Sequence, residues 1–184
     1  MKPDSALVQR VVPAKFFGIS PHRTVTWVVL HTMECGETMA ANEAVAGMFG
    51  RGDRRVSAHY CCGADGIIQC VRECDVAWAA GHTANSLGIH IELVGRAQQD
   101  EAAWDDEFSH RERAWLVQLV ADICGRNGLP PDRVDVDGAR VFSKGVLDHD
   151  TVRQAFRETD HTDVGQHFPW DELMIGVRAT MGVD

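Results

Sequence analysis

The longest run of β-branched and apolar positions lies at residues 24–30, Thr-Val-Thr-Trp-Val-Val-Leu, and it ends at His31. Because the run does not alternate between apolar and polar side chains, it predicts a central strand that is covered on both faces. Residues 87–94 predict a second strand, in which His90 and Glu92 share one face. A histidine at the end of an otherwise apolar strand indicates that this edge of the sheet carries a site.

A hairpin and a helix lie between these two strands. Segments 56–62 and 67–71 flank the sequence Gly-Ala-Asp-Gly and predict a β-hairpin. Residues 38–50 have apolar positions at helical spacing, and Thr38 is the predicted N-cap of that helix. The chain therefore alternates between strand and helix patterns in its first half.

The second half of the chain is mainly helical in pattern. The capping box Ser109-His110-Arg111-Glu112 predicts the start of a long helix that ends at Asn127-Gly128. Two further helices are predicted at residues 151–157 and from about residue 171 onward. Strands that alternate with covering helices predict an α/β fold, a single domain with a central mixed β-sheet covered by helices.

The N-terminal segment differs from the rest of the chain. Residues 1–23 hold three of the six prolines and lack a periodic apolar pattern. We assign them to an N-terminal extension that wraps the surface, and residues 24–184 to one domain.

Composition and charge exclude several classes of function. The chain has 184 residues, of which 45% are hydrophobic, and a formal net charge of −9. This acidic balance argues against nucleic acid as the main partner and against anionic membranes. No apolar run approaches the roughly 20 residues of a membrane span. The first ten residues lack the basic-then-apolar order of a signal peptide, so we expect synthesis in the cytoplasm.

The six cysteines could form disulfides, bind zinc, or remain free thiols that pack as small apolar side chains. The compartment favours free thiols over a disulfide framework. A zinc cluster is the alternative, since four cysteines lie close together in sequence, but their spacing is not the paired C-x2-C pattern. Small apolar side chains in the β-hairpin are the favoured interpretation of these four residues, Cys61, Cys62, Cys70 and Cys74.

A different group of residues is a better candidate for a metal site. His31 ends the first strand, His149 follows the apolar stretch 145–148, and Asp163 lies in a loop punctuated by glycine. Two neutral imidazoles and one carboxylate, with a fourth position open, form the ligand set of many catalytic zinc sites. From spacing alone, however, these histidines could equally be unrelated core or surface residues.

Four stretches of the chain, taken in order, resemble one known family, and this resemblance favours the metal-site interpretation of the histidines. The sequence resembles the zinc-dependent N-acetylmuramoyl-L-alanine amidases, the family that includes phage endolysin amidases and the peptidoglycan recognition proteins. The ending Thr-Asp-Val-Gly-Gln-His-Phe-Pro-Trp at residues 162–170 is the most specific of the matches. The stretches that carry the resemblance are Val28–Thr32, Val56–Tyr60 with Asp65-Gly66, Ile91–Gly95, and His149 with Thr162–Trp170.

The resemblance implies a role for each candidate residue. It implies that Zn²⁺ is held by His31, His149 and Asp163, and that Glu92 is the catalytic glutamate. His161 stands where bacterial members often carry a lysine, and from there it can donate to the developing oxyanion. The resemblance also places the loop with Trp78 and His82 beside the substrate groove, as substrate-binding residues.

The predicted function is therefore hydrolysis of the amide between N-acetylmuramic acid and L-alanine in peptidoglycan. The His161-Thr162-Asp163 variant favours a phage endolysin that acts on the cell wall after release, and we expect a monomer. One alternative is a non-catalytic peptidoglycan-binding module, although such modules typically lack a zinc ligand. Another is a zinc peptidase that cuts within the stem peptide, although the H-E-x-x-H motif is absent.

Overall fold

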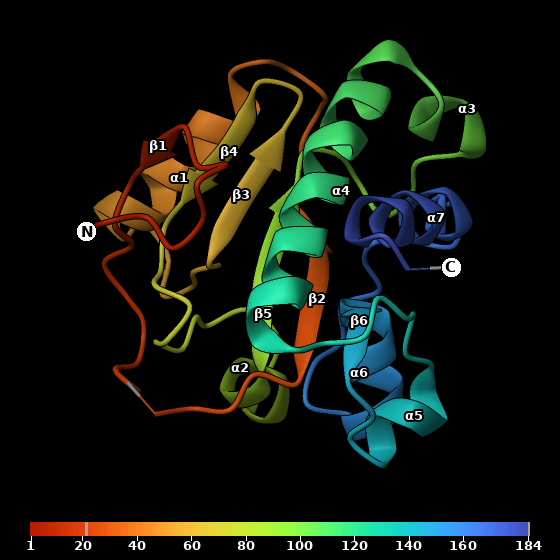
Figure 1. The fold of residues 1–184 in the computed structure, drawn as a ribbon. Helices are drawn as coiled ribbons and strands as arrows, with labels where there is room; N and C mark the ends of the chain where they lie inside the picture. The colour runs from red at the N-terminus through yellow and green to blue at the C-terminus, as the bar shows by residue number, and fades with distance from the viewer. Residues whose placement is uncertain (21, 184) are drawn as a thin grey trace.

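A six-stranded mixed sheet runs through the centre of the molecule (Figure 1). The computed structural model describes residues 1–20 and 22–183. Neighbouring strands are parallel except for β3 and β4, which are antiparallel across the predicted hairpin. The predicted α/β fold with a mixed sheet is therefore confirmed. In spatial order the strands are β1 (Arg10–Val11), β4 (Gly66–Gln69), β3 (Tyr60–Gly63), β5 (Gly88–Leu93), β2 (Trp27–Thr32) and β6 (Gly145–Asp148).

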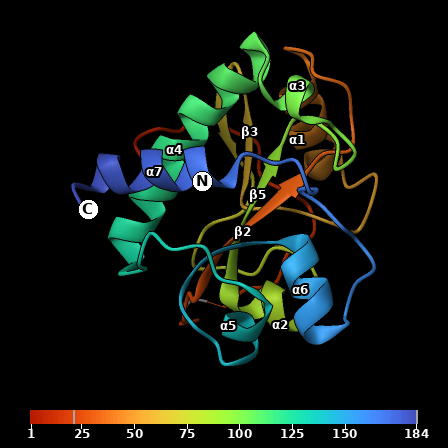
Figure 2. The ribbon, with the colours of Figure 1, turned by 90° about the vertical axis from the view of Figure 1, so that its right-hand side faces the viewer.

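Helices cover both faces of the sheet, as Figure 2 shows. The long helix α4 (Glu107–Asn127) and α7 (Trp170–Met181) pack on one face, with the short α3 (Glu101–Trp104) leading into α4. On the other face, α1 (Ala41–Arg51) covers β3 and β4. The same face of β2 is covered by three short helices, α2 (His82–Leu87), α5 (Val136–Arg140) and α6 (His149–Phe156).

Strand β2 shows why the site lies on the α6 side of the sheet. Val28 and Leu30 belong to the core under α4, whereas Trp27 and Val29 pack against the α2, α5 and α6 side. Since successive strand residues point to opposite faces, His31 lies on the same face as Val29. In the parallel register with β5, His31 is opposite Glu92.

Two predicted helix caps are wrong. Thr38 does not cap α1, which starts at Ala41 with Ala40 at the N-cap position and no side-chain cap. Ser109 does not cap α4 either, because Asp106 accepts the Ser109 backbone N–H and starts the helix earlier.

Glu112 has a different hydrogen-bond partner from the one that the sequence predicts, because it contacts the sheet. In the predicted capping box, Glu112 bonds back to the start of its own helix. In the structure its carboxylate accepts the backbone N–H of Val94, which follows β5. A hydrogen bond to the sheet thus replaces the predicted bond within the helix, and Glu112 links α4 to the end of β5.

The cysteines are free thiols in the described structure. Cys61 and Cys62 are successive residues of β3 and therefore face opposite sides of the sheet. Cys61 packs with the α1 side, and Cys62 packs with the α4 side. This arrangement agrees with the interpretation of these cysteines as apolar packing residues.

The N-terminal segment contributes to the sheet as well as to the surface. Arg10 and Val11 form the edge strand β1, which pairs in parallel with β4. Over residues 1–20 and 22–183, no helix combines the length and the apolar character that crossing a bilayer requires.

Candidate metal centre

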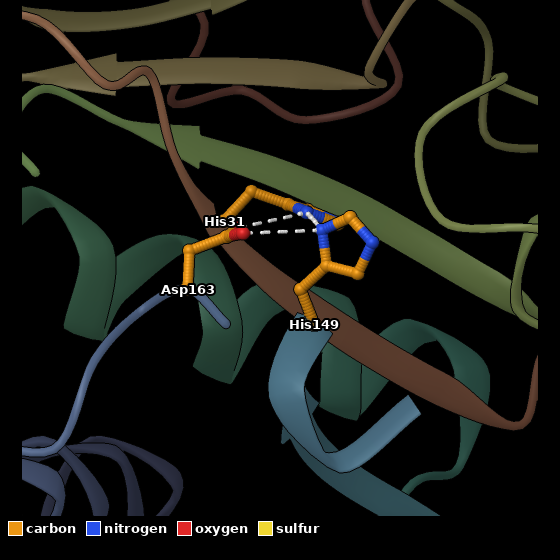
Figure 3. A group of neighbouring side chains, drawn as sticks. All are labelled: His31, His149 and Asp163. Atoms are coloured by element: carbon orange, nitrogen blue, oxygen red, sulfur yellow. Dashed lines mark hydrogen bonds and ion pairs between the residues drawn. The ribbon is translucent and has the colours of Figure 1, made fainter. Parts of the chain in front are cut away.

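Three buried side chains from distant parts of the chain converge at the carboxyl end of β2 (Figure 3). The Nδ1 atoms of His31 and His149 lie 3.0 Å apart. The two carboxylate oxygens of Asp163 each lie 3.3 Å from one of these nitrogens. The three residues predicted as ligands thus present three donor atoms to one point, and this group is able to hold a metal ion.

Local structure fixes the position of His149. Strand β6 pairs with β2, and Asp148 at its end is opposite Leu30. The Asp148 carboxylate accepts the backbone N–H of Thr151 and caps α6. His149 is consequently the first residue of α6, one position past the strand, and its ring reaches His31 on the neighbouring strand.

Backbone hydrogen bonds hold Asp163 in the loop between α6 and α7. The backbone N–H of Thr32 donates to the Asp163 carboxylate at 3.3 Å, and the backbone N–H of Asp150 donates to the Asp163 carbonyl at 2.9 Å. Two residues further on, Gly165 has a φ of +96° and packs against the Ala97 backbone. The loop is therefore fastened to both β2 and α6.

The far side of each imidazole also has a partner. The Nε2 atom of His31 lies 2.9 Å from Nδ1 of His90, and Nε2 of His149 lies 2.9 Å from the Thr159 hydroxyl. Metal-binding histidines are commonly oriented by such contacts to the other ring nitrogen. Both Nδ1 atoms are left facing Asp163, as a metal site needs.

Burial and hydrogen bonding set the charge states of two of these residues. Burial lowers the pKa of His31 to about 4, although its contact with Asp163 opposes this shift. Burial would raise the pKa of Asp163, but the hydrogen bonds with His149 and His31 outweigh it and hold that pKa far below its ordinary value. At neutral pH the site therefore offers a neutral His31 ring and an ionised Asp163, the forms that bind metals.

Glu92 faces the same site from β5. It is opposite His31 in the strand register and is half-buried. Burial raises the pKa of the Glu92 carboxyl well above its usual range, and the nearby charges of Asp163 and Glu34 raise it further. A carboxyl group with a raised pKa beside a metal site is suited to taking up and releasing a proton.

His161 lies at the rim of the site. Its ring stacks on His149 with centroids 4.9 Å apart, and its Nδ1 lies 3.6 Å from Asp163. The side chain is 61% exposed, so it is accessible to a bound molecule. A pocket of about 270 Å³ opens here, lined by His161 and Asp163 together with Glu34, Ala97, Gln98 and Asp160.

Within the described part of the chain, Trp78 and His82 make no hydrogen bond, ion pair or ring contact with the three converging residues. The Trp78 ring stacks on Phe16 at 6.1 Å, and its backbone N–H donates to Ser57. His82 is exposed and begins α2. Their assignment as substrate-binding residues stays a prediction.

Sequence reasoning missed the partners that orient the histidines. The sequence places His90 on one strand face with Glu92, and that alternation is the available signal for its position. Thr159 carries no signal in the sequence, because it meets His149 only after the loop folds back. The short helix α2, which contacts His90 through the Ala84 carbonyl, was also missed.

A mixed α/β fold with two imidazoles and a carboxylate converging at a strand end is typical of metal-dependent hydrolases. A family model described as N-acetylmuramoyl-L-alanine amidase matches residues 21–166, which is more than half of the chain. The chain belongs to this family. It is thus an enzyme that hydrolyses the amide between N-acetylmuramic acid and L-alanine in the cell wall.

Solved structures share the fold at low sequence identity. The Staphylococcus aureus hydrolase AmiA, in complex with its ligand, is 20% identical with a TM-score of 0.72, over 94% of this chain and 84% of that one. An AmpD derivative is 20% identical with a TM-score of 0.64, over 96% and 99%. The endolysin amidase LysCS from Clostridium intestinale is 14% identical with a TM-score of 0.56, over 98% and 100%. No curated protein matches the sequence.

Proposed function

We propose that this amidase is zinc-dependent and that His31, His149 and Asp163 are its zinc ligands. The observation that carries the proposal is the convergence of two Nδ1 atoms and a carboxylate within 4.8 Å of one another. Two imidazoles and a carboxylate match the three-ligand sets of catalytic zinc, which keep one position open. The partners on the far ring nitrogens, His90 and Thr159, support the same assignment.

The residues around the ligands then perform different steps of the reaction. When bound, zinc polarises the amide carbonyl and makes a water molecule more acidic. Glu92 takes the proton from the attacking water and passes it to the leaving nitrogen of L-alanine. His161 donates a hydrogen bond to the carbonyl oxygen as negative charge develops there. The C–N bond breaks, giving a free lactyl carboxylate and the free amino group of L-alanine.

The substrate is peptidoglycan, and we assign the enzyme to the endolysins that act on the intact wall after release from the cell. The exposed His161 beside the ligands supports this assignment, since it is the variant that the sequence shares with some phage members. Trp78 and His82 are proposed to contact the substrate farther along the groove. The enzyme is proposed to act as a monomer.

A digest of purified peptidoglycan tests the reaction. We expect new L-alanine amino termini by mass spectrometry, with no new reducing sugar ends. New amino termini inside the stem peptide would instead establish a zinc peptidase. Faster cleavage of soluble muropeptides than of intact sacculi would contradict the endolysin assignment while leaving the amidase reaction intact.

Metal analysis tests the ligands separately. The purified protein should hold about one zinc ion per chain. Asp163→Ala should abolish zinc retention and hydrolysis together, whereas Asp53→Ala, at a surface ion pair with Arg51, should leave both unchanged. Retention of zinc by the Asp163→Ala protein would show that the metal is bound elsewhere.

A further inference from the structure

We propose that His90 is a positioning residue that fixes the tautomer and orientation of His31. It lies at the centre of β5, opposite Val29, on the same face of the sheet as His31. The inference rests on the proposed function, because it concerns how His31 presents its Nδ1 atom to the metal.

The hydrogen bonds determine where the proton on His90 lies. The Nε2 atom of His90 is 3.1 Å from the Ala84 carbonyl oxygen. A carbonyl oxygen only accepts, so His90 carries its hydrogen on Nε2. A neutral imidazole has one N–H, and Nδ1 of His90 is therefore an acceptor.

The same logic extends to His31. Its Nε2 atom lies 2.9 Å from the acceptor Nδ1 of His90, so the hydrogen of His31 lies on Nε2. The lone pair of His31 is then on Nδ1, which faces Asp163 and His149. The chain from the Ala84 carbonyl through His90 to His31 thus selects the one tautomer that can bind a metal through Nδ1.

The surroundings of His90 hold this arrangement in place. His90 is completely buried, so water does not compete for its ring nitrogens. Its backbone N–H donates to Nδ1 of His59 at 2.9 Å, and the two rings stack with centroids 5.6 Å apart. The acceptor Ala84 belongs to α2, so this short helix holds His90, which in turn meets His31.

The opposite tautomer of His90 would disrupt the site. With its hydrogen on Nδ1, His90 would leave the Ala84 carbonyl without that partner and would present a donor to Nε2 of His31. The His31 hydrogen would then lie on Nδ1, between the groups that bind the metal.

Two substitutions of matching shape test the proposal. His90→Asn keeps an acceptor near the position of Nδ1. His90→Leu introduces a side chain with nearly the shape of asparagine but without an acceptor. We measure zinc affinity by competition with a chelator, alongside thermal unfolding of each apoprotein. We expect His90→Leu to bind zinc roughly 10- to 100-fold more weakly than the parent, and His90→Asn to bind clearly more tightly than His90→Leu. Equal affinities for the two variants would overturn the inference.

A spectroscopic measurement needs no substitution and decides the case even where a variant fails to fold. Long-range ¹H–¹⁵N correlation spectra of the zinc-loaded parent protein distinguish the two tautomers of each histidine. We expect His31 and His90 both to carry their hydrogen on Nε2. A hydrogen on Nδ1 of His90 would overturn the inference. A parent protein that binds no zinc would instead refute the proposed metal site.

Discussion

The Nε2 atom of His149 lies 2.9 Å from the Thr159 hydroxyl, so the second histidine of the site is held on its far side by a loop. The loop is itself anchored, since Glu158 accepts hydrogen bonds from the backbone N–H and hydroxyl of Thr83 in α2. Thr83 is the neighbour of Ala84, whose carbonyl holds His90. Both histidines of the site therefore depend on the same short helix for their orientation.

Thr159→Val should weaken zinc binding by about tenfold, because it removes the hydroxyl and keeps the shape of the side chain. Thr159→Ser retains the hydroxyl and serves as the control, with an affinity close to that of the parent. Chelator competition measures both. Similar losses in the two variants would mean that packing of the loop, and not the hydrogen bond, orients His149.

Glu92→Gln should preserve zinc content and peptidoglycan binding while hydrolysis falls by roughly 10²- to 10⁴-fold. The amide keeps the shape of the carboxyl group but cannot accept a proton from water. Turnover on purified peptidoglycan and zinc content are measured on the same samples. A rate within about threefold of the parent, well short of that range, would remove Glu92 from the reaction.

His161→Ala should lower the rate and leave zinc in place, because His161 lies at the rim and the three proposed ligands are unchanged. His161→Lys should retain more activity than His161→Ala, because the lysine ammonium can also donate a hydrogen bond to the developing oxyanion. Hydrolysis rates on purified peptidoglycan compare the proteins. Loss of zinc from the alanine variant would make His161 a ligand.

Stability should depend on pH through Glu112. Burial raises the pKa of this carboxyl well above its usual range, although the hydrogen bond from Val94 lowers it. The folded state therefore binds the proton more tightly than the unfolded state. The stability associated with that proton is fully present below the unfolded pKa, about 4.3, and is lost as the pH rises toward the folded pKa.

Glu112→Gln keeps an acceptor for Val94 and cannot ionise. The parent loses stability as Glu112 is forced to ionise, whereas the variant does not. The thermal unfolding midpoint of the variant minus that of the parent should therefore increase from pH 4 to pH 7. Glu107→Gln, at an exposed position of the same helix, is the control and should show little of this dependence. A constant difference between Glu112→Gln and the parent across this range would contradict the assignment.

Gly165→Ala should destabilise the loop that carries Asp163. The φ of +96° at Gly165 strains any other residue, and an added Cβ would collide with the Ala97 carbonyl. The strain alone is of the order of 1–3 kcal/mol in the free energy of unfolding. Gly125→Ala, in helix α4 with no heavy atom within 4 Å of the added Cβ, should instead stabilise the protein by about 0.5–1 kcal/mol. Denaturant unfolding of both variants provides the comparison.

Strong local patterns made the main strands and helices predictable: an unbroken apolar run for the central strand and apolar positions at helical spacing for the helices. The apolar run before His31 became β2, and the hairpin turn, α1, α4, α6 and α7 lie close to their predicted positions. Burial of these elements follows from their own side chains, so local sequence is sufficient to find them.

Short elements and long-range contacts were not predictable in the same way. Helix α2 has six residues and no side-chain cap, and its sequence has no apolar stripe. Asp106 and Ser109 are both good N-cap residues. Asp106 is the N-cap in the structure, and Glu112, which a capping box at Ser109 would need, accepts the Val94 N–H instead. The family resemblance brought His31, His149 and Asp163 together, but the partners behind the two histidines became visible only in three dimensions.

His31 and His149 are 118 residues apart in the chain although their rings touch. During translation His31 emerges early, and the two side chains that converge on its Nδ1 atom follow only with α6 and the loop with Asp163. A nascent or proteolytically shortened chain without this C-terminal segment lacks two of the three converging side chains, and His31 with its neighbour His90 does not replace them. With the proposed zinc ligands, metal capture therefore requires that the chain up to Asp163 has been made and has docked beside β2, and a retained ion marks a molecule in which these distant segments have assembled.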